Sequence, residues 1–136
     1  MRPAGLVAAA ATAAALAGCG SDTADLMAIR DTASGVAGTT RTEIRVTDDG
    51  RGACNRGPLA ELPSQMLLDA REAKRDLRPF AKRGANFTVG GPNEREFVVR
   101  TFDGTVRWGP RPGLPAAIGR ATALALRLER RLCPRA

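Results

Sequence analysis

Apolar residues recur near the C-terminus at intervals of four, three, four, three and four, and this pattern limits the fold more than any other feature. The residues concerned are Leu114, Ile118, Ala121, Ala125, Leu128 and Leu132. This spacing places their side chains on one side of an α-helix, so we predict a helix of about 18 residues that Pro134 ends. A helix with one apolar side must bury it against another element, which the preceding residues have to supply.

Two short strands precede this helix. The segments "EFVVRTF" and "TVRW" are joined by Asp103-Gly104, a dipeptide that favours a tight type I′ turn. This turn pairs Phe102 with Thr105 and places Val99 opposite Trp108. Four large side chains then share the face that we expect to point into the core: Phe97, Val99, Val106 and Trp108.

A second hairpin is expected earlier in the chain. Residues 40–47 alternate between polar and apolar types, which indicates a half-buried strand. Asp48-Asp49-Gly50 is typical of a turn, and residues 51–55 form the returning strand.

An amphipathic helix separates the two hairpins. Pro63 and Ser64 begin it, with Ser64 as the cap, and Pro79 ends it after Arg78. Its apolar stripe consists of Met66, Ala70, Ala73 and Leu77, and residues 81–94 are predicted to be a loop. The order β-β-α-β-β-α predicts one α+β domain over residues 40–136, with two layers: a four-stranded antiparallel sheet and two helices on one face.

The N-terminus has the composition of an export signal. Residues 4–16 form an apolar run after Met1-Arg2, and the run is too short to span a bilayer. "LAGC", Leu16 to Cys19, resembles the lipobox of bacterial lipoproteins. The resemblance implies that residues 1–18 are a signal peptide, that Cys19 is lipidated, and that the protein is anchored to the outer face of the cell membrane. The alternatives are an ordinary signal peptide cleaved nearby and a buried N-terminal helix.

Residues 19–39 are rich in Gly, Ala, Ser, Thr and Asp, and their only apolar cluster is Leu26 to Ile29. We interpret this segment as a mostly flexible tether that follows the lipidated Cys19, and one helical turn near Leu26 is the alternative for its apolar cluster. Extended, the nineteen residues from Gly20 to Gly38 would reach at most about 60 Å.

The two remaining cysteines, Cys54 and Cys133, form an even pair in a small exported domain, and we predict a disulfide between them. A three-residue turn with Gly50 in the left-handed conformation places Cys54 opposite Ile44, facing inward. A two-residue turn would place Cys54 opposite Arg45, so the disulfide favours the first register.

The composition argues against catalysis. The chain has no His, which removes the commonest general base and the commonest metal ligand. We find no metal-ligand cluster and no cofactor loop, so we expect no enzyme activity, no cofactor and no metal site. With 21 basic and 14 acidic residues the net charge is +7, but acidic residues interleave with the basic ones on the first helix, so nucleic acid is not an expected partner. The sequence favours an extracytoplasmic binding or accessory protein of the cell envelope.

Residues 40–132 loosely resemble the emfourin-like inhibitors of thermolysin-type proteases, in the order of a strand, a Gly-bearing turn, a Leu-rich helix, a hairpin and a helix that begins with Pro-Ala. Arg51 departs from that pattern because it replaces the second Gly of an early "GG". The resemblance implies a membrane-tethered protease inhibitor as the alternative function. The candidate partner-binding loop is "GPRPG", with Pro110, Arg111 and Pro112, although a purely structural turn would have the same sequence.

Overall fold

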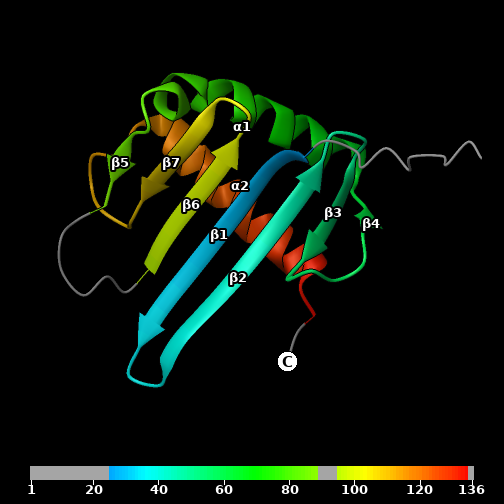
Figure 1. The fold of residues 1–136 in the computed structure, drawn as a ribbon, viewed down its shortest axis with the longest axis horizontal. Helices are drawn as coiled ribbons and strands as arrows, with labels where there is room; N and C mark the ends of the chain where they lie inside the picture. The colour runs from blue at the N-terminus through cyan, green and yellow to red at the C-terminus, as the bar shows by residue number, and fades with distance from the viewer. Residues whose placement is uncertain (1–24, 89–94, 135–136) are drawn as a thin grey trace, which may run out of the picture.

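A seven-stranded sheet and two helices make up the computed structural model, which describes residues 25–88 and 95–134 (Figure 1). The predicted signal peptide and Cys19 lie outside the described residues. The strands are β1 (Asp25–Gly35), β2 (Gly38–Thr47), β3 (Arg51–Cys54), β4 (Ala60–Glu61), β5 (Asn86–Phe87), β6 (Arg95–Thr101) and β7 (Gly104–Trp108). The helices are α1 (Ser64–Lys82) and α2 (Ala116–Leu132).

The sheet has the order β4-β3-β2-β1-β6-β7-β5, and neighbours are antiparallel except β5 and β7, which are parallel. The α+β class with two helices is therefore confirmed. The four-stranded, purely antiparallel sheet is wrong, because β1 joins its centre and the two-residue strands β4 and β5 extend its edges.

The central strand β1 is the feature that differs most from the fold predicted from the sequence. It falls within the segment that we interpreted as a tether, so the folded domain already includes Asp25 rather than beginning at residue 40. β1 pairs with β2 along its length and with β6 on its other side. Met27 and Ile29 are buried on its core face, and Asp31, two residues further on, continues that face. A central strand forms backbone hydrogen bonds with a neighbouring strand on each side. A polar composition therefore does not prevent it from forming.

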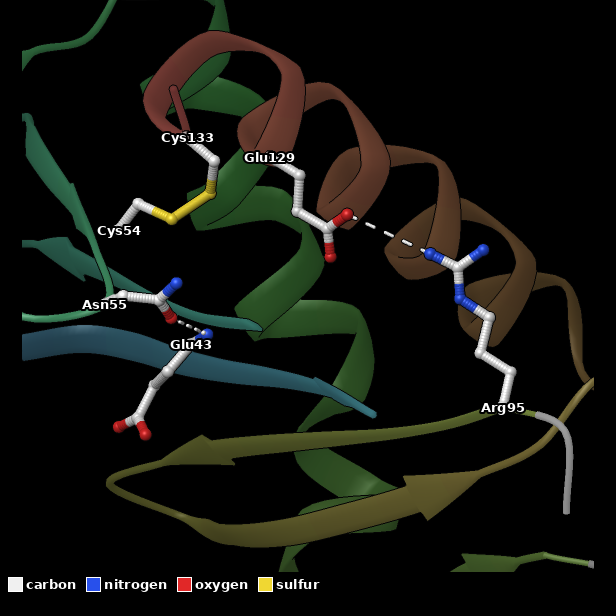
Figure 2. Close-up of a disulfide and its surroundings, with 6 residues drawn as sticks. All are labelled: Glu43, Cys54, Asn55, Arg95, Glu129 and Cys133. Atoms are coloured by element: carbon white, nitrogen blue, oxygen red, sulfur yellow. Dashed lines mark hydrogen bonds and ion pairs between the residues drawn. A yellow bond between two sulfur atoms is a disulfide. The ribbon is translucent and has the colours of Figure 1, made fainter. Parts of the chain in front are cut away.

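The turn between β2 and β3 has the predicted three-residue form. Gly50 has a φ of +92°, and Ile44 lies opposite Cys54. The inward register for Cys54 is confirmed, and Cys54 and Cys133 form the predicted disulfide, with an S–S distance of 2.03 Å. Figure 2 shows this bond between β3 and the end of α2.

The β6–β7 hairpin has a different register from the prediction. Thr101 pairs with Gly104 and Val99 with Val106, so the loop consists of Phe102 and Asp103. A shift of two residues leaves every side chain on its face, and the four predicted core residues are all buried. The shift arises at Gly104, which has a φ of +139° and lies so close to α1 that a Cβ there would be 2.2 Å from the carbonyl oxygen of Ala81.

The first helix continues past its predicted end. Pro79 lies inside α1, which runs to Lys82, and Ser64 is the first helical residue and makes no capping hydrogen bond. Pro79 removes one helical N–H donor, but Leu77 and Ala81 are buried on either side of it and hold the last turn against the sheet. The second helix spans Ala116–Leu132, close to its predicted range.

Both helices contact the sheet and each other, and Figure 1 shows α2 behind the sheet and α1 along its upper end. Their apolar stripes are buried, as predicted: Ala70, Ala73 and Leu77 on α1, and Ile118, Ala121, Ala125 and Leu128 on α2. Two ion pairs join the helices at their outer side, Arg120 with Asp76 at 3.1 Å and Arg127 with Asp69 at 2.9 Å.

Candidate functional site

A cavity of about 420 Å³ lies between the start of β6, the end of β7, the loop after β7 and residues 119–126 of α2. Most of its lining is apolar, and the residues include Phe97, Trp108, Pro110, Leu114 and Leu126. Two arginines, Arg95 and Arg111, also line it. Pockets of this size, mostly apolar with a few polar groups, are typical of small-molecule sites, which occupy roughly 300 to 1,000 Å³.

The aromatic wall of the cavity follows from the hairpin register. Phe97 and Trp108 are directly opposite each other on β6 and β7, and their rings stack with centroids 5.6 Å apart and an angle of 16°. Trp108 Nε1 donates a hydrogen bond to Thr122 Oγ1 on α2 at 2.9 Å, and this hydroxyl donates to the carbonyl oxygen of Ile118 at 2.9 Å. The indole is therefore fixed in orientation and has its one polar atom satisfied.

A partly buried charge cluster lies beside the cavity. Arg95 forms two hydrogen bonds to the Asp31 carboxylate on β1, and its Nε lies 3.0 Å from Asp31 Oδ1. The Arg95 guanidinium also lies 5.0 Å above the Phe97 ring and 3.9 Å from Glu129 Oε2 on α2, as Figure 2 shows for the Glu129 contact. Asp31 is 6% exposed. The cluster thus joins β1, β6 and α2 with two carboxylates and one guanidinium.

Two carboxylates share one guanidinium in this cluster, and the pKa values of Glu129 and Arg95 are both raised. Burial and the neighbouring Asp31 carboxylate together raise the pKa of Glu129 to about 7, and the smaller opposing effects of Arg95 and Arg130 do not offset them. The hydrogen bonds to Asp31 raise the pKa of Arg95. Glu129 Oε1 is buried and has no hydrogen-bond partner among the described residues. The surroundings of Glu129 therefore favour its protonated form.

The predicted partner-binding loop forms part of the rim of the cavity. Pro110, Arg111 and Pro112 are all exposed, and the first two line the cavity whereas Pro112 does not. The Arg111 guanidinium lies 5.9 Å from the centroid of the Phe87 ring on β5. Phe87 in turn packs edge-on against Phe80 of α1 at 5.8 Å.

The disulfide does not belong to this cavity. Cys133 follows the last turn of α2, whereas the helix residues that line the cavity are Gly119, Thr122 and Leu126. Beside Cys54, the Asn55 side chain accepts a hydrogen bond from the Glu43 backbone N–H at 2.8 Å, as Figure 2 shows. The contacts around the cysteines are those of a structural bond that fixes the end of α2 to β3.

The charge cluster was not predicted from the sequence. Asp31 was placed in the tether, and Arg95 and Glu129 were not singled out. One signal was available: Gly119, Thr122, Leu126 and Glu129 are spaced three, four and three along the chain, so one side of α2 carries them all. A single Glu at the end of such a stripe is a weak indication without its partner on β1.

Among the described residues, no group of three or more Cys, Asp or Glu side chains could hold a metal ion. In the same part of the chain, no helix combines the length and the hydropathy needed to cross a membrane. Comparisons of the sequence with protein-family models and curated proteins, and of the structure with solved structures, found no significant match.

Proposed function

We propose that this protein is a lipid-anchored, extracytoplasmic binding protein of the cell envelope that has no catalytic activity of its own. The lipobox-like "LAGC" supports an anchor at Cys19. The single observation that carries the binding function is the cavity beside Phe97 and Trp108. The two-layer arrangement belongs to this proposal, and the contacts of both helices with the sheet and with each other support it.

The lining indicates the chemical class of the ligand. The stacked Phe97 and Trp108 rings offer an apolar wall on which a flat or aliphatic group can pack. The charge of Arg95 is already engaged by Asp31, whereas Arg111 forms no ion pair in the described part of the chain. An apolar body with one negatively charged group, which Arg111 would bind, therefore fits the cavity best.

The cavity can be filled from α2 without disturbing the fold. Gly119 lines it, and a Cβ built at Gly119 has no neighbouring atom within 4 Å. We expect Gly119→Leu to abolish binding of the anionic aromatic probe anilinonaphthalene sulfonate, and Gly119→Ala to retain it. Fluorescence titration measures probe binding by both variants. Because Gly in a helix costs about 1 kcal/mol relative to Ala, neither variant should have a lower Tm than the wild type. Equal probe binding by both variants would refute this site.

The role of Arg111 is tested by charge removal. Arg111→Ala should weaken binding of the same probe at least about tenfold, since a charge-assisted contact contributes on the order of 1.5 to 3 kcal/mol. Arg41→Ala is the matched control because Arg41 is an exposed arginine on β2, outside the cavity. If the two variants lose the same affinity, the effect is one of overall charge and the assignment of Arg111 is wrong.

A membrane-tethered protease inhibitor is the alternative function, and the exposure of Pro110, Arg111 and Pro112 favours it. Two prolines limit the backbone freedom that a protease would have to remove on binding. An inhibitor should slow a secreted metalloprotease or serine protease stoichiometrically, and Arg111→Ala should weaken that inhibition without lowering the Tm. If a panel of both protease classes is unaffected by the wild type, the inhibitor function is excluded.

A further inference from the structure

A row of exposed cations lies on one side of α1. Arg71, Arg75, Arg78 and Lys82 follow one another at intervals of four, three and four, so the helix presents them in line, and all four are exposed. Leu68 precedes them on the same side of the helix and is 54% exposed. An apolar side chain at the end of a basic row is typical of a surface that meets a partner with both negative and apolar groups.

Two contacts place this row at the end of the sheet where β1 begins. Arg71 Nη2 donates a hydrogen bond to the carbonyl oxygen of Asp48 in the β2–β3 turn at 3.1 Å, and Arg78 Nε lies 3.3 Å from Asp103 Oδ2 in the β6–β7 turn. Figure 1 shows both turns and the start of β1 at this one end, beside α1. Phe102 occupies the tip of the β6–β7 turn and is 95% exposed. We call the surface formed by Leu68, Arg71, Arg75, Arg78, Lys82 and Phe102 the α1 edge.

The aspartates at this end do not cancel the positive charge. Asp25, Asp49 and Asp103 each form an ion pair, with Arg45, Arg51 and Arg78 respectively. Asp48 and Glu72 are the unpaired acidic neighbours in the described part of the chain. Arg75 and Lys82 form no ion pair among the described residues, so their charges are available to a partner.

The length of chain between the anchor and the domain fixes which end faces the membrane. Only residues 20–24 separate Cys19 from Asp25, the first residue of β1. Six peptide steps span at most about 20 Å. A lipid on Cys19 therefore holds the start of β1, and with it the α1 edge, close to the bilayer surface, where electrostatic attraction acts over a Debye length of about 10 Å.

We propose that the α1 edge docks on the surface of a bilayer that contains anionic phospholipids, with the cations bound to headgroups and Phe102 and Leu68 inserted at the boundary of the acyl region. The orientation in the cell rests on the proposed lipidation of Cys19. In that orientation, the β1–β2 hairpin points away from the membrane. The docking gives the anchored domain one defined orientation instead of free rotation about its lipid.

Removing the positive charges of the row tests whether electrostatic attraction to the headgroups contributes to membrane binding. All variants are made in the full chain carrying Cys19→Ala, which cannot be lipidated, and are sedimented with vesicles of phosphatidylcholine alone or mixed with an equal amount of phosphatidylglycerol. Arg75→Gln with Lys82→Gln should lower partitioning onto the anionic vesicles about 25-fold, roughly fivefold per residue. The matched control is Arg41→Gln with Arg131→Gln, two exposed arginines outside the α1 edge, which should change it less than about twofold.

Phe102→Trp tests the insertion. Its fluorescence should shift to the blue with anionic vesicles and be quenched by brominated acyl chains, whereas the parent chain, whose one Trp is the 1% exposed Trp108, should show neither change. The proposal is overturned if the row and control variants lose binding equally, or if Trp at position 102 is not quenched.

Palmitate labelling in cells tests the anchor separately. If the wild type is not labelled but Arg75→Gln with Lys82→Gln loses vesicle binding, the docking surface is supported. The lipid anchor and the orientation in the cell are then wrong. If Cys19→Ala abolishes labelling but Arg75→Gln with Lys82→Gln binds vesicles as before, the lipid anchor is supported. The docking surface is then wrong.

Discussion

Single residues determine the local geometry of this fold where two backbones approach closely. Gly104 is the clearest case, because it combines a φ of +139° with a backbone contact to α1. The same position explains why the Asp-Gly turn signal led to a register two residues away from the observed one. The dipeptide marks a turn correctly, but which residues occupy its corners depends on what packs against it.

Gly104→Ala should therefore destabilise the protein by about 3 kcal/mol, from strain at a positive φ and from a Cβ that would contact the Ala81 carbonyl. The measurement is urea unfolding followed by circular dichroism. Gly84→Ala is the control, since Gly84 also has a positive φ but no atom within 4 Å of an added Cβ. It should cost about 1 kcal/mol, and an equal cost for both variants would show that the contact with α1 is unimportant.

Glu129 gives the stability a pH dependence of unusual sign for a carboxyl group. Its folded-state pKa, about 7, is above the ordinary value of 4.5, so the folded protein binds more protons than the unfolded chain between these values. The stabilising contribution is fully present below about pH 4.5 and is lost as the pH rises through about 7, with a total of at most about 3 kcal/mol. The chain has no His whose titration would obscure this window.

Glu129→Gln should flatten the stability profile between pH 5 and pH 8, because a neutral amide keeps the packing and can donate to Asp31. Thermal unfolding at a series of pH values measures this. At pH 8 the variant should be at least as stable as the wild type, and a parallel decline of the two proteins with pH would show that Glu129 is not the titrating group.

At the scale of elements, the disulfide links α2 to β3 across a sequence separation of 79 residues. The helix stripes and the β2–β3 register followed from the sequence because periodicity and turn chemistry are local. The ends of the helices were harder to predict from the sequence, and Pro79 is the example. A proline in the last turn removes one helical hydrogen bond, but the burial of Leu77 and Ala81 offsets this loss.

Cys54→Ser with Cys133→Ser should lower the free energy of unfolding by on the order of 4 kcal/mol, mainly because the unfolded chain regains the entropy of a long loop. Urea unfolding of the double variant is compared with that of the wild type with and without dithiothreitol. Reduction of the wild type should reproduce the loss. If the reduced protein is as stable as the oxidised one, the bond contributes nothing to folding.

At the scale of the whole molecule, β1 decides where the domain begins. It lies between β2 and β6 in the sheet and contributes Met27 and Ile29 to the core. The domain boundary at residue 40 would remove it and would leave two halves of a sheet with no strand between them.

A chain that begins at Thr40 should consequently not fold, whereas one that begins at Asp25 should. Amide chemical-shift dispersion in an NMR spectrum distinguishes the two outcomes. A folded chain from Thr40 would show that the remaining strands can pair directly and that β1 is dispensable.

The sequence by itself determined the elements whose signals are local: the two amphipathic helices, the two hairpins, the inward Cys54 and the residues of the core face. Tertiary structure alone decided the rest. Residues 25–35 became a central strand because two partner strands supply their hydrogen bonds. Asp31, Arg95 and Glu129 met because β1, β6 and α2 pack together. Local patterns report the preferences of neighbouring residues, whereas these features depend on the free energy of contacts between residues distant in the chain.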